Sequence, residues 1–188
     1  MPVQIGARLD SGFDDPLGML QDCHRRIERF LAVLCDVAER ARSRALTAEE
    51  ATAVRNALGY FREAGRRHNA DEEESLFPRM RDKESARPAE SALHSLDQLE
   101  ADHRAAEALH SAIDSLYSDW LTANRLDPEQ GRTLLEKTAR LRALYAEHIH
   151  IEETAVFPEA ARILDRDNLA AIGSEFRARR ADGQARNS

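Results

Sequence analysis

The sequence predicts an all-α protein that folds as an antiparallel up-down four-helix bundle with a short C-terminal fifth helix. Its 188 residues include only 8 glycines and 6 prolines, whereas alanine, leucine, arginine and glutamate, which favour helices, are abundant. Apolar residues recur at three-, four- and seven-residue steps, as at Leu134, Leu141 and Leu144. This is the spacing of a helix with one buried face. Four long segments of this kind with short connections indicate antiparallel neighbours.

Helix-capping signals mark where the predicted helices begin. An aspartate precedes a proline at 15–16 and again at 127–128, and Thr47 with Glu50 forms a capping box. We expect Pro78 to end the second helix, because proline disrupts a helix interior. The expected helices span residues 16–43, 48–76, 89–123, 128 to just before Pro158, and about 167–179.

These helices divide the chain into an N-terminal extension, a bundle, a C-terminal helix and a tail. The expected ranges are 1–15, 16–160, 161–180 and 181–188 respectively. The tail, "ADGQARNS", is polar, and we expect it to be disordered.

The composition argues against several classes of partner. A formal net charge of -7 disfavours nucleic-acid binding, and arginine pairs such as Arg179-Arg180 are expected on solvated helix faces. No stretch reaches the roughly 18 apolar residues of a membrane span, and no secretory signal opens the chain. Cys23 and Cys35 are 12 positions apart on one predicted helix, too far apart for a disulfide. We therefore expect a cytoplasmic protein with no membrane or nucleic-acid partner.

One phrase occurs twice in the chain. "HNADEEESLFP" at 68–78 and "HIHIEETAVFP" at 148–158 share the pattern H-x-x-x-E-E-x-x-x-F-P, 80 residues apart. His24 and His103 repeat at nearly the same offset, 79 residues. The chain therefore resembles two copies of one helical hairpin, and we expect a pseudo-two-fold axis through the bundle.

Each predicted bundle helix carries one histidine with a glutamate four residues later, and such residues stand one turn apart on the same face. The pairs are His24–Glu28, His68–Glu72, His103–Glu107 and His148–Glu152. A single histidine on an apolar stripe is more often a core residue than a ligand, and a single pair is more often a surface contact. Four pairs in one bundle would bury several charges, which is costly unless a cation compensates them. The pattern therefore predicts a metal site.

The ligand types narrow the choice of metal. Structural zinc prefers a closed set of cysteine and histidine, and the two cysteines supply no pair of thiolates. Mixed imidazole and carboxylate ligands on facing helices suit iron or manganese. Two iron ions fit the number of ligands best, and manganese or a mixed pair remains an alternative.

The doubled phrase resembles the hemerythrin-like, or HHE cation-binding, family over about residues 16–160. The resemblance implies a four-helix bundle with two non-heme iron ions, Fe2+ or Fe3+, joined by an oxo or hydroxo bridge. It also implies terminal imidazole ligands and two bridging glutamates. These residues would be His24, His68, His103 and His148, with Glu72 and Glu152 as the bridges.

The sequence departs from the oxygen-carrying members of that family at two positions. Where they have a second histidine on the third helix this chain has Glu107, which we expect to be a seventh ligand. Where they have an aspartate five residues after the last histidine, this chain has Glu152 at four. An added carboxylate favours the ferric state and weakens the case for reversible O2 carriage. For Glu28, a salt bridge to an arginine is as well supported as ligation.

Other inward-facing residues are assigned to packing. His110 is expected in the core or beside the ligands, and the three tyrosines are expected to pack and make one hydrogen bond each. The tyrosines are Tyr60, Tyr117 and Tyr145. His94 and His150 lie off the apolar stripes and are expected at the surface.

We expect a protein that binds or reacts with O2, NO or peroxide. The alternatives are an enzyme that detoxifies peroxide or NO, and an iron storage or handling protein. A sensor of this kind would need a separate protein partner, and we expect a monomer or weak dimer.

Overall fold

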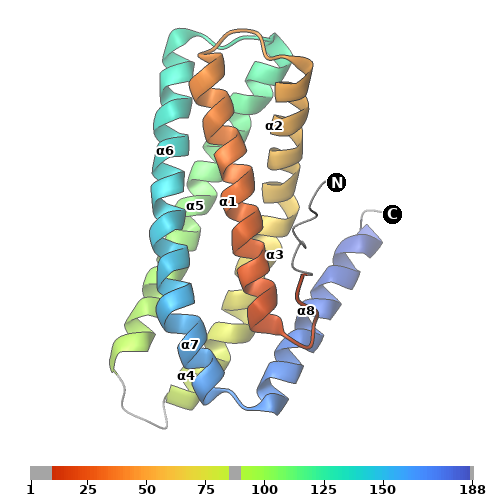
Figure 1. The fold of residues 1–188 in the computed structure, drawn as a ribbon, viewed down its shortest axis with the longest axis vertical. Coiled ribbons are helices and arrows are strands. Elements are labelled where there is room, and N and C mark those ends of the chain that lie inside the picture. Colours follow the sequence, from red (N-terminus) through yellow and green to blue (C-terminus); the bar gives the residue numbers. More distant parts are fainter. Residues whose placement is uncertain (1–9, 85–89, 187–188) are drawn as a thin grey trace, which may run out of the picture.

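The computed structural model describes residues 10–84 and 90–186, and every regular element within those ranges is helical (Figure 1). The α-helices are α1 (Pro16–Ala41), α2 (Ala48–Tyr60), α3 (Arg66–Asp71), α4 (Phe77–Glu84), α5 (Glu90–Ala123), α6 (Pro128–Ile151), α7 (Phe157–Ile163) and α8 (Arg166–Arg186). Three π-helical segments interrupt them, η1 (Phe61–Gly65), η2 (Glu72–Leu76) and η3 (Glu152–Val156). The predicted all-α bundle is confirmed.

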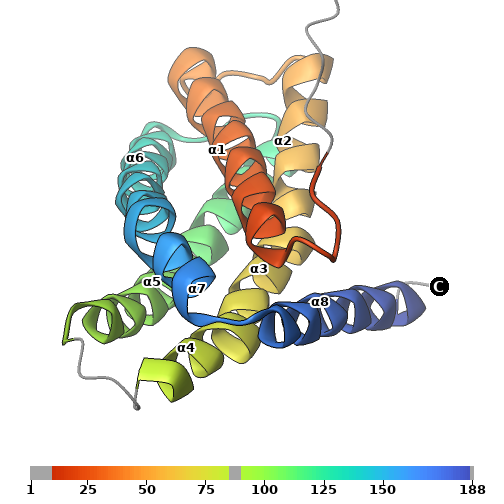
Figure 2. The same cartoon turned by 60° about the horizontal axis from the view of Figure 1, so that its bottom comes forward.

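Four helical rods form the bundle and run alternately up and down. The first is α1, the second is the unbroken series from α2 to α4, the third is α5 and the fourth is the series from α6 to α7. Helix α8 crosses the base of the bundle, where it packs beside α1, α3 and η2 (Figure 2).

The predicted helix starts are confirmed by their caps. The Asp15 carboxylate accepts a hydrogen bond from Gly18 N at 3.0 Å. Thr47 forms the expected capping box with Glu50, and Asp127 forms a further one at the start of α6. Each cap satisfies backbone N–H groups that the first helical turn leaves without a partner.

Neither Phe-Pro dipeptide ends its helix, and the ends predicted at residue 76 and before Pro158 are wrong. The second rod continues to Glu84 and the fourth to Ile163. In both rods the Phe-Pro pair directly follows a π-helical segment. There the hydrogen-bond ladder has already shifted to a wider turn, so a proline without an N–H disrupts less than it would in a regular helix.

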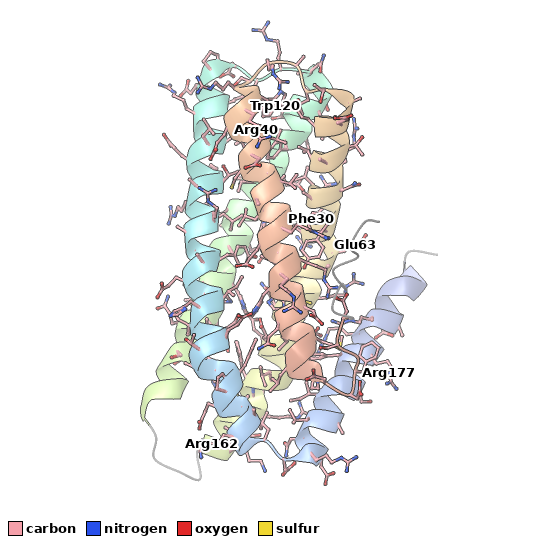
Figure 3. The ribbon with its side chains drawn as sticks, viewed as in Figure 1. Phe30, Arg40, Glu63, Trp120, Arg162 and Arg177 are labelled. Atoms are coloured by element: carbon pink, nitrogen blue, oxygen red, sulfur yellow. The ribbon has the colours of Figure 1, made fainter. Side chains whose placement is uncertain are left out.

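The interior consists of two apolar clusters. The larger one includes Leu34, Leu134 and Trp120, and Trp120 lies at the end of the bundle away from α8 (Figure 3). The smaller one includes Phe77 and Phe176, at the end covered by α7 and α8. Along each rod, the histidine of the repeated pattern lies between residues of the two clusters. A polar layer therefore separates them.

The C-terminal helix is longer than predicted. It runs to Arg186, so residues 181–186 of the predicted disordered tail are helical, while 187–188 lie outside the described residues. Arg179 and Arg180 are not the solvated pair that we expected, because both donate hydrogen bonds to the fully buried Asp71 carboxylate. These contacts fix α8 to the second rod, one residue before Glu72.

Within the described part of the chain, no helix is long and apolar enough to cross a membrane. Cys23 and Cys35 are both buried free thiols, in agreement with the expected absence of a disulfide between them.

Candidate metal centre

Six buried side chains from all four rods meet in the polar layer between the apolar clusters. They are His24, His68, Glu72, His103, His148 and Glu152. Each is at most 4% exposed. Their donor atoms form two groups, each within 4.8 Å, and the groups share the two glutamates. One group contains the first two histidines and the other contains the last two.

Each glutamate places one oxygen near each pair of histidines. Glu152 Oε2 lies 3.0 Å from His24 Nε2, and Glu152 Oε1 lies 3.3 Å from His148 Nε2. Glu72 repeats the arrangement. Its Oε1 lies 3.5 Å from His68 Nε2, and its Oε2 lies 3.3 Å from His103 Nε2. The two carboxylates thus lie where they can bridge two cations.

The second glutamate of each repeated phrase contacts a histidine on another rod. Glu73 Oε1 lies 2.6 Å from His103 Nδ1, and Glu153 Oε1 lies 2.9 Å from His24 Nδ1. An Nδ1–H that donates to a carboxylate fixes the tautomer and turns the Nε2 lone pair towards the centre. The sequence reading assigned no role to these two glutamates, although the doubled Glu-Glu was a visible signal.

The phenylalanine of each phrase covers the same histidine as the second glutamate. Phe77 stacks on His103 with ring centroids 6.4 Å apart, and Phe157 stacks on His24 at 5.4 Å. Each copy of the phrase therefore supplies one glutamate to the centre and holds one imidazole of a different rod from two sides. This exchange between the halves agrees with the predicted pseudo-two-fold arrangement.

Two of the three π-helical segments begin at the central glutamates. Glu72 is the first residue of η2 and Glu152 is the first residue of η3. Such segments occur mostly as single wide turns and often at functional sites. Here the wide turn follows the inward glutamate and precedes the phenylalanine that stacks on a histidine of another rod.

Burial and mutual charge shift the proton affinities of the cluster. Burial raises the pKa of Glu72 well above its usual range, and the charge of Glu152 raises it further. Burial also lowers the pKa of His24, but Glu152 beside it outweighs this effect and raises that pKa to about 9. The pKa of His68 is lowered by burial and by the neighbouring His24. The raised pKa values of Glu72 and His24 favour bound protons, which reduce the negative charge of the cluster. Bound cations would have the same effect.

The unpartnered polar atoms of the cluster fit a cation. All four oxygens of Glu72 and Glu152 are buried, and none has a hydrogen-bond partner among the described residues. His24 Nε2 is in the same condition, because its 3.0 Å approach to Glu152 lacks the geometry of a hydrogen bond. Buried acceptors without donors are costly, and a metal ion uses their lone pairs. The donor set, imidazole nitrogen with carboxylate oxygen, also suits a transition metal.

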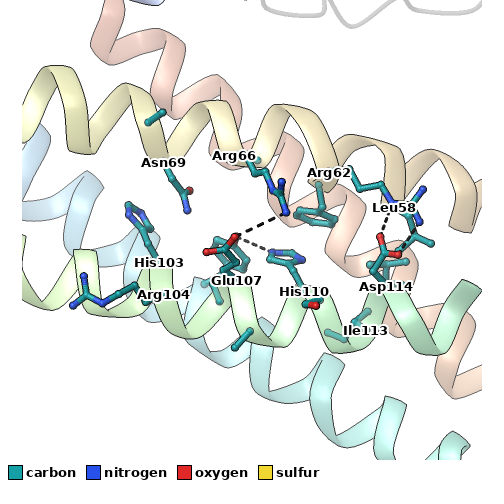
Figure 4. Close-up of a pocket in the computed structure, with 18 of the residues that line it drawn as sticks. Leu58, Arg62, Arg66, Asn69, His103, Arg104, Glu107, His110, Ile113 and Asp114 are labelled. Carbon is teal, nitrogen blue, oxygen red and sulfur yellow. Dashed lines mark hydrogen bonds and ion pairs between the residues drawn. The ribbon is translucent and has the colours of Figure 1, made fainter. Parts of the chain in front are cut away.

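The seventh expected ligand, Glu107, does not join the cluster. Its side chain is 70% exposed and lies 3.9 Å from Arg66 Nη2 (Figure 4). Glu28 is also exposed and lies outside both groups.

The remaining polar residues have structural partners. Tyr60 and Tyr117 donate to the carbonyl oxygens of Cys23 and Leu34, and Tyr145 is hydrogen-bonded to His110 at 3.0 Å. His150 is exposed, as predicted. The side chain of His94 lies outside the described residues.

Fold and site together define a metal-binding four-helix-bundle protein whose buried histidines and glutamates are suited to cations. A family model, the hemerythrin HHE cation-binding domain, matches residues 15–160, and the chain belongs to that family. The chain is also similar to a protein of Haemophilus influenzae described as uncharacterized. The two are 27% identical over 168 residues, which cover 89% of this chain and 91% of that protein.

Proposed function

We propose that this protein holds two iron ions and uses them to bind or reduce a small oxygen or nitrogen species, O2, NO or peroxide. The proposed ligands are the six clustered side chains, with Glu72 and Glu152 as bridges. The observation that carries the proposal is the pair of glutamates shared between two otherwise separate histidine pairs.

The number of donors supports an open centre. Each group offers two imidazoles and two carboxylate oxygens. Non-heme iron with so few protein ligands keeps positions for exogenous ligands. A pair of iron ions supplies two electrons, one from each ion, and this is the chemistry that the bound group would add. The chain's own contribution is to hold the imidazoles of His24 and His103 in one tautomer, to bring two carboxylates between the four imidazoles and to exclude bulk water.

The reaction of the reduced protein tests the proposal. The protein is loaded with Fe2+ under argon, then mixed separately with O2, NO and H2O2 while its visible spectrum is followed. New absorption that persists indicates a stable adduct and a carrier or sensor. Prompt oxidation with consumption of H2O2 indicates an enzyme.

Zinc-loaded protein is the control, since zinc has no redox chemistry. If the iron-loaded protein retains its iron but reacts with none of the three species, the proposal is wrong. Storage or handling of iron would then be the better account.

A further inference from the structure

A pocket of about 950 Å³ opens between the second rod and α5, next to the metal centre (Figure 4). It reaches the middle of the bundle, because Leu34 of α1 and Tyr145 of α6 also line it. A water molecule or a diatomic needs on the order of 30 Å³, whereas organic ligands occupy pockets of roughly 300–1,000 Å³. The pocket is therefore far larger than the small species of the proposed function require.

Local features of the two helices keep this seam open. The π-helical segment η1 forms one side of it, and its last residue, Gly65, has no side chain. On the opposite side, α5 contributes Ala106 and Ala108. The small residues Gly65, Ala106 and Ala108 leave room for the pocket between the second rod and α5.

The charged residues around the pocket are largely neutralised. Arg62 forms two hydrogen bonds with the Asp114 carboxylate, at 2.6 and 2.7 Å, and Arg66 faces Glu107 at 3.9 Å (Figure 4). Glu73 is bonded to His103, as described above. Such paired charges do not select an ionic ligand. Apolar side chains form much of the inner wall, and these are Leu34, Leu58, Phe61, Ala106 and Ile113.

A neutral hydrogen-bonding pair lies in the pocket wall. His110 Nε2 is 3.0 Å from Tyr145 Oη. Burial lowers the pKa of His110 to about 4, so its imidazole is uncharged at neutral pH. No described residue bonds His110 Nδ1, which remains for a ligand. The Tyr145 ring also meets His148 of the centre edge-on, with centroids 6.3 Å apart.

We propose that this pocket binds a neutral amphipathic organic molecule and that, in the chemistry of the proposed function on which this step rests, the molecule is an organic hydroperoxide. Its O–OH head hydrogen-bonds the His110–Tyr145 pair, and its apolar body lies against Phe61, Leu58 and Ile113. In the reaction the O–O bond breaks. Reduction of the hydroperoxide to an alcohol and water would consume two protons from solvent and two electrons, which a pair of ferrous ions held by the six clustered side chains would supply.

The binding step is tested without any reaction. Cumyl alcohol, the product-like analogue of cumene hydroperoxide, is titrated into metal-free and zinc-loaded protein by calorimetry and saturation-transfer NMR. We expect one saturable site in both forms. Gly65→Leu, which narrows the pocket beside Phe61, should weaken binding at least tenfold. Gly65→Ala should weaken it little, because the added Cβ meets Phe61 Cδ1 at an ordinary 3.6 Å.

His110→Leu provides an independent variant in case Gly65→Leu does not fold, and it should also weaken binding about tenfold. His150→Leu is its matched control, since His150 is exposed and outside the pocket. No saturable binding to the wild type, or equal binding to His110→Leu, would overturn the proposed site.

A single-turnover experiment tests the assignment of the hydroperoxide. The reduced iron-loaded protein is mixed with cumene hydroperoxide or H2O2. Gly65→Leu and His110→Leu should slow the oxidation by cumene hydroperoxide at least tenfold. Gly65→Leu, which narrows only the space for the apolar body, should leave the rate with H2O2 within about twofold. If the alcohol binds but neither peroxide oxidises the wild type, the peroxide chemistry of the proposed function and the hydroperoxide assignment are both wrong. The binding site is then still supported. Oxidation by H2O2 without alcohol binding refutes the site and leaves the proposed function.

Discussion

Glu73 Oε1 lies 2.6 Å from His103 Nδ1, across the gap between the second rod and α5. Glu153 has the same relation to His24 at 2.9 Å, across the gap between the fourth rod and α1. Glu73 follows Glu72 and Glu153 follows Glu152 in the sequence, so each Glu-Glu pair has two roles. The first carboxylate is offered to the cation, and the second orients an imidazole of another rod.

Replacing the orienting carboxylates should weaken metal binding without removing a ligand. We expect Glu73→Gln and Glu153→Gln to lower the affinity for Fe2+ by roughly 10–100-fold each, since loss of a hydrogen-bonded carboxylate behind a metal-bound histidine has effects of that size. Glu147→Gln, an exposed site on α6, is the control and should bind like the wild type. Anaerobic competition with a chelator measures the affinities. Equal affinities in all three variants would show that these contacts are incidental.

The glutamate that the sequence added to the ligand set should be dispensable. Glu107→Gln is expected to keep the metal content and the melting temperature of the wild type, because its side chain is 70% exposed. Glu72→Gln should lose metal and melt at a lower temperature in the metal-loaded form. Elemental analysis and thermal unfolding of the two variants decide the point. Loss of metal from Glu107→Gln would show that Glu107 is a metal ligand after all.

The stability of the fold should depend on pH through His110. Its pKa is about 4 in the folded protein and about 6.5 in a model peptide, so the unfolded chain binds more protons between these values. The stabilising contribution is therefore complete above about pH 6.5 and is lost as the pH falls towards 4. At 1.36 kcal/mol per pKa unit the full contribution is roughly 3 kcal/mol. Urea unfolding at pH 7 and pH 5 should show a smaller drop in His110→Leu than in the wild type or His150→Leu, and an equal drop would contradict this explanation.

Two glycines in helices should respond to alanine in opposite directions. A Cβ at Gly173 of α8 would lie 1.9 Å from the Phe13 carbonyl oxygen, so Gly173→Ala should destabilise the protein by about 1–3 kcal/mol. A Cβ at Gly59 of α2 would meet nothing within 4 Å, and Gly59→Ala should stabilise by roughly 0.5–1 kcal/mol through helix propensity. Chemical denaturation of both variants measures the difference. A stabilised Gly173→Ala would mean that α8 does not pack on the N-terminal segment in this way.

The bundle and the clustering of six of the seven expected side chains were accessible to sequence reasoning, because they depend on local rules. Caps such as Thr47 with Glu50 place helix starts, and apolar spacing places His68 and His148 on the buried stripes. The histidine–glutamate pairs at four-residue spacing then bring most of the site together in one layer.

The structure differs from the sequence-based predictions where residue spacing alone does not determine the side-chain direction, the helix end or the packing. A four-residue spacing puts Glu107 on the same face as His103, but the direction of a side chain on a long helix also depends on which rods surround each turn. Spacing alone does not predict the π-helical segments at Glu72 and Glu152, and without them a proline indicates a helix end. Burial of Asp71 by Arg179 depends on how α8 packs on the second rod, which the sequence alone does not reveal.

The central claim is that two cations share the Glu72 and Glu152 carboxylates, and anaerobic titration of Fe2+ into metal-free protein tests it most directly. We expect saturation at two ions per chain in the wild type, and fewer than one in the double variant Glu72→Gln/Glu152→Gln. A wild type that saturates below two ions, or a double variant that still binds both, would contradict the claim.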